Sequence, residues 1–237
     1  MNFNINVNTD ELNIISCVSK NYKNFVEPFI AFCNESNPGI HIELWIDNPD
    51  KFSKFENEKI KIHKLPIKNA SAYRYIVEPT LKTKYTYISD IDILYTEIIL
   101  PFHLIQIKKT GLPFSNIVRK NELRLSGLHF VDSEAWYRDT QKTRKNLEKL
   151  YHDEKMLYHI ASENYDISKV PVGLVNRPVH GIHCSTEGKP RDPYSAFGWE
   201  ITGQKIAMFD YVVERYGLFN EYFEEKIYKP LKQKEKS

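Results

Sequence analysis

The sequence has few of the features that mark a secreted or membrane-spanning protein. Its three cysteines, Cys17, Cys33 and Cys184, are too few and too scattered for a disulfide framework or a zinc site. No apolar run approaches the roughly 20 residues that a membrane-spanning helix needs. Residues 1–10 are rich in Asn and lack the basic and apolar regions of a secretory signal. We therefore expect a cytoplasmic protein whose thiols are reduced.

An excess of charge of either sign is also missing. The 33 basic and 31 acidic residues leave a formal net charge of +2, which creates no overall field to attract nucleic acid. At 237 residues, with 41% hydrophobic and 27% charged residues, the chain can bury the core of one globular α/β domain. We expect that domain over residues 1–218, followed by a tail over residues 219–237, and no nucleic-acid partner.

In the first half, short runs rich in β-branched residues alternate with segments of helical periodicity. The expected strands cover residues 12–18, 40–46, 59–63 and 85–89, and the expected helices cover residues 22–35, 49–55 and 69–79. This alternation predicts a mostly parallel central sheet with helices on both faces, an architecture of many nucleotide-binding proteins. In the less regular second half, we expect extended segments at residues 111–118, 125–131 and 170–184 and helices at residues 133–150, 153–161 and 199–216.

The tail combines aromatic and apolar residues with lysines. Residues 221–237 contain five lysines, together with Tyr222, Phe223, Ile227 and Tyr228. A basic, aromatic segment of this kind either lies on an anionic membrane surface, which would place the protein peripherally at the inner face of the membrane, or is solvated.

Two carboxylates at the end of the strand expected at residues 85–89 form the sharpest feature. Alternate residues of an extended chain point to the same side, so Asp90 and Asp92 can face one cation at the carboxyl edge of the sheet. Such a cation would offset the repulsion between the carboxylates and neutralise a diphosphate leaving group. Aspartates in an Asp-X-Asp triplet also cap helices or bind loop amides, and the triplet alone does not decide between these roles.

Ala72-Tyr73-Arg74-Tyr75, followed by Tyr85 to Tyr95, resembles the arginine helix and acidic strand of family 8 glycosyltransferases. That family includes bacterial lipooligosaccharide galactosyltransferases. The resemblance implies a Rossmann-like GT-A fold in a single domain, with a smaller sheet on the acceptor side. It also implies a metal site for Mn²⁺ or Mg²⁺ at Asp90 and Asp92.

The same resemblance gives roles to the neighbouring residues. Ser89 and Ile91 would lie beside the donor, and Arg74 would hold and orient the donor during catalysis. A guanidinium suits this role because its planar fork matches phosphate or sugar oxygens. From the residues alone, Arg74 is equally well explained by an ion pair with Glu78 one helical turn later.

Two later segments resemble parts of the family's sugar pocket. Ser126 and Gly127 match a strand that lines the donor sugar, although the family usually has Asn at the position of Ser126. Asp153 and Glu154 resemble an Asp-Gln pair beside the donor sugar, which implies a catalytic role for both. From the residues alone, Gly127 is equally consistent with a bulge and Asp153 with a helix N-cap.

The segment around His180 and His183, followed by Gly188 and Lys189, resembles the family's late His strand and Gly-Lys-Pro loop. This implies that an imidazole completes the metal site and that the loop binds the donor phosphates. Residues three apart on a strand face opposite sides, so both histidines would bind one ion only if the chain bends at Gly181. We favour His183. Two carboxylates and one imidazole suit manganese or magnesium, and the nitrogen favours manganese.

Ser19, Tyr22 and Asp47 follow the first two expected strands, where GT-A enzymes bind the nucleotide. Tyr22 either stacks on a uracil base or starts the following helix as an ordinary half-buried aromatic. The chain has no Gly-rich phosphate loop between Ser16 and Tyr22, a loop that nucleotidyltransferases of this fold usually contain.

Together, these motifs imply a metal-dependent hexosyltransferase that moves a sugar from a nucleotide sugar, with UDP favoured, to a hydroxyl group. The acceptor would be a glycan or lipid-linked glycan in bacterial surface polysaccharide or lipopolysaccharide synthesis. The rivals are a nucleotidyltransferase and a non-catalytic glycan-binding module, which the 13% aromatic content suits. The family retains the anomeric configuration, whereas inversion with a carboxylate base is the alternative.

Overall fold

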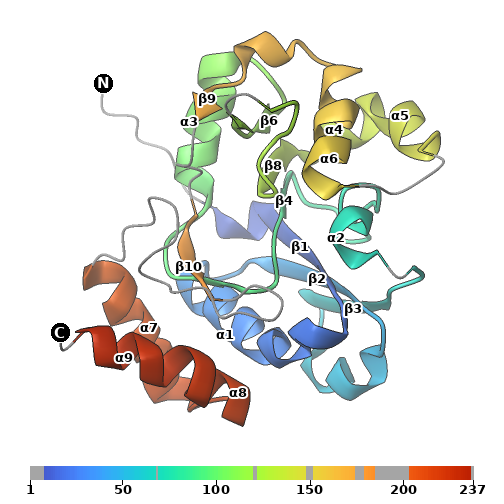
Figure 1. Cartoon of the computed structure of the whole chain (residues 1–237). Coiled ribbons are helices and arrows are strands. Elements are labelled where there is room, and N and C mark those ends of the chain that lie inside the picture. Colours follow the sequence, from blue (N-terminus) through green and yellow to red (C-terminus); the bar gives the residue numbers. More distant parts are fainter. Residues whose placement is uncertain are drawn as a thin grey trace.

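Six strands form the central sheet of the computed structural model, which describes residues 8–67, 69–119, 122–147, 152–173, 179–184 and 203–235. In sheet order the strands are β3 (Ile60–Lys64), β2 (His41–Ile46), β1 (Leu12–Val18), β4 (Tyr85–Ile88), β8 (His129–Asp132) and β6 (Phe114–Ser115) (Figure 1). The first four are parallel, and β8 is antiparallel to β4 and β6. The expected α/β architecture with a mostly parallel sheet is therefore confirmed.

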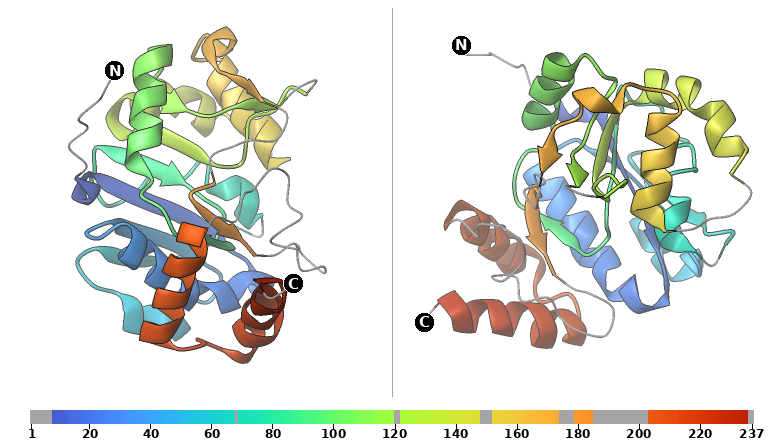
Figure 2. Two further views of the ribbon diagram at one scale, coloured as in Figure 1. Left: turned by 90° about the vertical axis from the view of Figure 1, so that its left-hand side faces the viewer. Right: turned by 45° about the horizontal axis from the view of Figure 1, so that its top comes forward.

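Helices cover both faces of this sheet because alternate residues of its central strand point to opposite sides. All of β1 is buried. Ile14 and Val18 belong to one hydrophobic cluster, and Ile15 and Cys17 belong to a second. The first cluster includes residues of α1 (Val26–Ser36) and α7 (Gly203–Tyr216), and the second includes residues of α4 (Ser133–Asp139) and α6 (Asp153–Ser162). Figure 2 shows these two groups of helices on opposite sides of the sheet.

One helix, α3 (Leu100–Thr110), is absent from the elements expected from the sequence. Pro101 lies in its first turn, and Gly111 ends it with a φ of 67°, a left-handed conformation that glycine adopts without strain. The buried Asn37, which follows α1, accepts a hydrogen bond from Ile99 N at 2.9 Å. This tertiary contact ties the start of α3 to the end of α1.

In the second half, side chains take over backbone hydrogen bonds, so the extended segments are shorter than expected. Asn116 Nδ2 donates to the carbonyl oxygens of Ser126 and Leu128 at 3.1 and 3.0 Å, and regular strand β8 begins only at His129. The remaining strands form two small sheets, which pair β5 (Ile93–Tyr95) with β10 (Gly181–His183) and β7 (Val118–Arg119) with β9 (Val172–Gly173).

Several helical segments are also shorter or tighter than the periodicity predicted. The chain preceding α1 is a 3-10 helix, and the helix expected from residue 133 divides at Thr140 into α4 and α5 (Gln141–Lys145). The 3-10 helices cover Thr9–Glu11, Lys20–Phe25, Pro49–Phe55 and Ile167–Lys169.

The tail is helical and packs on the core. It comprises α8 (Glu221–Phe223), a π-helical turn (Glu224–Tyr228) and α9 (Lys229–Glu235). Phe223, Ile227 and Leu231 are buried in the same hydrophobic cluster as Phe209 of α7. The core therefore covers three of the side chains that a membrane contact would expose. Among the described residues, no helix combines the length and the apolar character needed to cross a membrane.

The helix expected over residues 69–79 is reduced to α2 (Ala70–Tyr73), and Glu43 on β2 holds the chain further along, at Thr80 and Leu81. The Glu43 carboxylate accepts hydrogen bonds from the N–H groups of Thr80 and Leu81 at 2.8 Å each. It also accepts hydrogen bonds from Asn13 Nδ2 at 2.7 Å and His63 Nε2 at 3.0 Å. Burial by itself would raise the pKa of Glu43, but these hydrogen bonds outweigh burial and lower that pKa.

We expect Glu43→Gln to lose about 1–3 kcal/mol of unfolding free energy at neutral pH, because a buried network loses its charged acceptor. The pKa of Glu43 is lower in the folded chain than its ordinary value of 4.5. Its contribution is therefore fully present above that ordinary value and is lost as the pH falls through the folded pKa. In urea unfolding between about pH 6 and pH 3, the variant should lose less stability than the wild type.

The matched control for this prediction is Glu58→Gln, at an exposed position just before β3. This variant should retain the acid sensitivity of the wild type. If Glu43→Gln and the wild type lose stability equally on acidification, the role given to Glu43 is wrong.

Candidate functional site

Two carboxylates and one imidazole from distant parts of the sequence meet at the end of β4. Asp90 and Asp92 lie in the turn between β4 and β5, and His183 lies on β10. One ligand atom from each of the three side chains lies within 4.8 Å of the others, and His183 Nε2 is 3.1 Å from Asp92 Oδ2. Asp92 and His183 are buried, and Asp90 is partly exposed.

This donor set fits a divalent cation. Carboxylate oxygens suit manganese and magnesium, and an imidazole nitrogen favours manganese. Placing Asp90 and Asp92 side by side in a largely buried turn is costly unless positive charge offsets their repulsion. The cluster is therefore compatible with a divalent metal held by Asp90, Asp92 and His183.

β10 can approach β5 closely because position 181 is glycine. A Cβ atom added to Gly181 would lie 2.1 Å from Leu94 O, a backbone atom of the paired strand. Cys184 N donates to Asp92 O at 2.8 Å, so the contact between the two chain segments continues to the acidic turn. Gly181 thus permits the strand pairing that brings His183 to the two aspartates.

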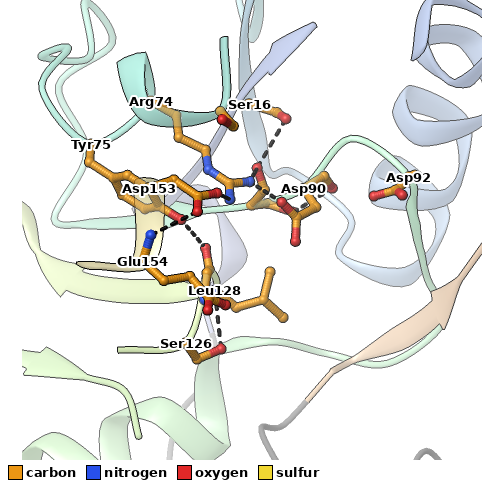
Figure 3. Close-up of polar contacts among 12 residues, drawn as sticks. Ser16, Arg74, Tyr75, Asp90, Asp92, Ser126, Leu128, Asp153 and Glu154 are labelled. Carbon is orange, nitrogen blue, oxygen red and sulfur yellow. Dashed lines mark hydrogen bonds and ion pairs between the residues drawn. The ribbon is translucent and has the colours of Figure 1, made fainter. Parts of the chain in front are cut away.

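Arg74 lies between the acidic turn and the start of α6, as Figure 3 shows. Its Nη1 donates to Ser89 O at 2.9 Å and forms an ion pair with Asp90, and its Nη2 lies 3.4 Å from Asp153 Oδ2. Burial by itself would lower the pKa of Arg74, but the carboxylates of Asp90 and Asp153 raise that pKa well above its usual value. The guanidinium therefore carries its charge inside the protein.

Glu78, the alternative partner expected for Arg74, is bound elsewhere. Its Oε1 accepts a hydrogen bond from Arg144 Nη2 at 2.8 Å. Arg144 also donates to Ile76 O at 3.0 Å and Tyr137 O at 2.9 Å, so it ties α5 to the segment after α2. Arg74 is thus directed toward the acidic groups of the site.

Asp153 and Glu154 begin α6 and have different partners. Asp153 is the first residue of the helix rather than its N-cap, and its Oδ1 accepts a hydrogen bond from Glu154 N at 2.8 Å. A carboxylate in the first turn also interacts favourably with the helix dipole. Glu154 forms ion pairs with Arg119 and Arg124, and its Oε1 accepts a hydrogen bond from Gly127 N at 3.2 Å.

Ser126 and Gly127 are buried, and the hydrogen bond from Gly127 N to Glu154 places them beside the start of α6. Figure 3 shows Ser126 beside Leu128. Tyr75 OH donates to Gly127 O at 2.8 Å, and Ser126 Oγ accepts a hydrogen bond from Leu128 N at 3.3 Å. Ser126 also borders a small cavity that is lined by His103, Gln106, Ser115, Asn116, Ile117 and Leu128. The polar lining around Asn116 is a part of this region that sequence reasoning missed, because no local pattern links Asn116 to Ser126.

His180 lies apart from the acidic turn, against His103 of α3. The Nε2 atoms of the two rings are 3.1 Å apart, and His103 Nδ1 is 2.7 Å from Ser115 Oγ. Burial, with a smaller effect from Lys205, lowers the pKa of His180 to about 4, and burial lowers the pKa of His103 well below its usual value. Both imidazoles are therefore neutral at neutral pH. Of the two candidate histidines, only His183 joins the carboxylate pair.

The residues expected to bind the nucleotide lie at the carboxyl ends of β1 and β2. Ser19 O accepts a hydrogen bond from Tyr22 N at 3.0 Å, and the Tyr22 ring centroid lies 6.3 Å from that of Phe25. Asp47 Oδ1 forms an ion pair with Lys23 Nζ at 2.7 Å. Tyr22 and Asp47 are partly exposed at the same edge of the sheet, which is compatible with the nucleotide site expected from the sequence.

The other residues expected beside the donor differ in their placement. Ser89 is buried, and its Oγ donates to Asp90 O at 2.9 Å and bonds with Tyr95 OH. The Ile91 side chain belongs to the hydrophobic core. Gly188 and Lys189 lie outside the described residues.

The sequence matches no family model and no curated protein. Its structure is similar to two crystal structures of the glycosyltransferase GlyE from Streptococcus pneumoniae TIGR4. The apo form has a TM-score of 0.52 at 11% identity over 86% of this chain and 63% of GlyE, and the second has a TM-score of 0.50 at 10% identity over 88% and 64%. The chain thus spans less than two thirds of the GlyE chain that it matches.

The galactosyltransferase LgtC, in complex with donor and acceptor sugar analogs, has a TM-score of 0.48 at 10% identity over 91% of this chain and 100% of its own. The likeness to GlyE shows that the two chains share a fold. A sequence identity of about a tenth gives no information about substrate or activity. The chain therefore has the GT-A type of α/β fold, as the resemblance implied.

His183→Gln and His180→Gln apply the same change three residues apart. We expect His183→Gln to weaken Mn²⁺ binding about tenfold or more, because one of three ligands is lost. His180→Gln should lower the Tm through the lost contact with His103 but change the Mn²⁺ affinity by less than about threefold. Calorimetric titration with Mn²⁺ and thermal unfolding measure the two effects. An equal loss of affinity in both variants would contradict the choice of His183.

Gly181→Ala should cost about 1–3 kcal/mol of unfolding free energy, because the new methyl group meets the backbone of the paired strand. Mn²⁺ binding should weaken with it, since His183 would move away from the aspartates. The control is Gly203→Ala at the start of α7, where an added Cβ atom meets nothing within 4 Å. Urea unfolding and Mn²⁺ calorimetry on both variants test this, and wild-type behaviour of Gly181→Ala would refute the close strand contact.

Proposed function

We propose that this chain is a metal-dependent glycosyltransferase that transfers a sugar from a nucleotide-sugar donor to an acceptor hydroxyl. The observation that carries the proposal is the convergence of Asp90, Asp92 and His183 at the carboxyl end of β4 in a sheet of the GT-A type. Ligands of open α/β sheets bind outside the carboxyl ends of the strands. GlyE, whose fold this chain shares, is itself a glycosyltransferase, which supports the reaction class.

In this proposal, Asp90, Asp92 and His183 hold the cation, which supplies compensation for the negative charge that develops on a diphosphate leaving group. Arg74 adds a second positive charge beside that of the cation. Ser89 O and two carboxylates fix its orientation, so its positive charge stays beside the candidate metal ligands, where it favours negative charge on a departing diphosphate. The acceptor oxygen then forms a bond to the anomeric carbon as the bond from that carbon to the diphosphate breaks, and the hydroxyl proton passes to an oxygen of the departing diphosphate.

The finer parts of the proposal follow from the resemblance. Manganese is favoured over magnesium because one ligand is an imidazole. A UDP-sugar is the favoured donor, with Tyr22 beside the base and Lys189 at the phosphates. The acceptor is a glycan or a lipid-linked glycan of bacterial surface polysaccharide or lipopolysaccharide synthesis.

The test is turnover of a panel of UDP, GDP, CMP and TDP sugars by the purified chain, with and without Mn²⁺. We expect Mn²⁺-dependent release of the nucleoside diphosphate or monophosphate from one donor. Asp92→Asn should reduce that release by a factor of about 100 or more, since it removes a charged ligand while keeping the side-chain shape. The control Asp50→Asn, at an exposed position before β3, should retain wild-type turnover.

Two results would contradict the proposal. Glycan binding without turnover of any donor would identify a binding module. Consumption of a nucleoside triphosphate and a sugar phosphate, with release of pyrophosphate, would identify a nucleotidyltransferase.

A further inference from the structure

Glu154 is enclosed by positive groups of its own chain. Its Oε1 pairs with Arg119 Nη2 and accepts a hydrogen bond from Gly127 N at 3.2 Å, and its Oε2 lies 3.3 Å from Arg124 Nη1. Arg124 also pairs with Glu122, so two carboxylates match the two guanidinium charges. The lone pairs of the Glu154 carboxylate are thus engaged, which makes it a poor nucleophile or base toward a substrate.

These contacts make Glu154 a link between three elements. Leu125 N donates to Glu154 O at 3.3 Å, so both the backbone and the side chain of Glu154 bind residues 125–127. Tyr75, which follows the helix α2, holds the same segment through its hydrogen bond to Gly127 O at 2.8 Å. Arg119 belongs to β7, so the small sheet is joined to the start of α6.

Asp153 has different surroundings. Its side chain is 23% exposed, whereas that of Glu154 is 11% exposed. Its Oδ2 faces Arg74 at 3.4 Å, and Arg74 pairs in turn with Asp90. Figure 3 shows Arg74 between Asp90 and Asp153, with Glu154 directed toward Ser126 and Leu128. The Arg74 guanidinium therefore connects Asp153 to the candidate metal ligands, whereas Glu154 faces residues 125–127, which we call the wall segment.

We infer that Glu154 is a positioning residue that fixes the wall segment of residues 125–127 and does not act on the substrate, whereas Asp153 keeps the role beside the donor sugar that the family resemblance implies. This assignment rests on the proposed glycosyltransferase function, and for Glu154 it replaces the catalytic role expected from the resemblance with a positioning role. In the proposed function residues 125–127 line the donor sugar, so loss of Glu154 should weaken donor binding, whereas loss of Asp153 should impair the transfer itself.

Steady-state kinetics with the donor identified above test the division of roles. Asp153→Asn should reduce kcat about 100-fold and change the donor KM by less than about threefold. Glu154→Ala should raise the donor KM about tenfold and change kcat by less than about threefold. Glu154→Gln keeps an acceptor oxygen for Gly127 N, so it should partly restore the donor KM. A catalytic carboxylate would not tolerate that change, so equal loss of kcat in Glu154→Gln and Glu154→Ala would overturn the inference.

Arg119→Gln provides a second check on the same contact. If Glu154 acts through its partners, Arg119→Gln should raise the donor KM as Glu154→Ala does. The double variant should then be little worse than either single variant, because both changes break one unit. Fully additive effects on the donor KM would overturn the link between the two residues.

Hydrogen exchange of the backbone amides in residues 125–128 tests the positioning role without any substrate. Glu154→Ala should accelerate exchange at Gly127 about tenfold, and Asp153→Asn should leave it unchanged. Wild-type protection in Glu154→Ala would overturn the role of Glu154 whatever the kinetics show. A wild-type chain that turns over no donor would overturn the proposed function and the role of Asp153, while the exchange result would still decide the role of Glu154.

Discussion

The ion pairs and hydrogen bonds of the buried Arg74 guanidinium hold together the polar residues at the carboxyl end of β4. A charge inside a protein is tolerated only where partners and hydrogen bonds offset its desolvation. Arg74 meets this requirement through the neighbouring residues Ser89 and Asp90 and through Asp153, which together come from two separate parts of the chain. Ser16 Oγ donates to Ser89 O as well, at 3.0 Å, so β1 belongs to the same network. The start of α6 and the acidic turn are therefore held in one arrangement.

A second constraint acts through the backbone rather than through charge. His183 reaches the acidic turn because β10 pairs with β5 in one register, and that register requires a glycine at position 181. The same register sends His180 to the other side, where it meets His103 and where burial keeps both rings neutral. This stretch of chain thus carries His183, which is placed to bind a cation, and His180, which packs against His103.

The two constraints suit a site that must manage a large change of negative charge. At the edge of the sheet where nucleotides bind in this type of fold, Arg74 supplies a positive charge and the candidate metal ligands are compatible with a cation. The wall segment of residues 125–127 is held by the hydrogen bond from Tyr75 and by Glu154, whose charge is balanced by Arg119 and Arg124. The candidate metal ligands and Arg74, which would act on a substrate, are thus separate from Glu154 and its arginine partners, which hold the wall segment.

Much of the first half was readable from local pattern. The strand at residues 12–18 has the expected bounds, because Ile14, Ile15 and Val18 favour extended backbone, and the Asp90 and Asp92 pair follows β4 as expected. Helix α3 could also have been recognised from Pro101 at its start and Gly111 at its end, but its few buried residues hid its periodicity. The contacts of Glu43 with Thr80 and Leu81 could not be recognised, because they join residues 37 and 38 positions apart in the chain.

The sequence by itself determined the α/β alternation, the paired carboxylates and the two histidines three residues apart, because each depends on residues close together in the chain. Only the tertiary structure decided which histidine joins the carboxylates, that Arg74 pairs with Asp90 rather than Glu78, and that Glu154 faces two arginines. Those choices depend on strand register and on contacts between residues far apart in sequence, and local periodicity contains no information about either.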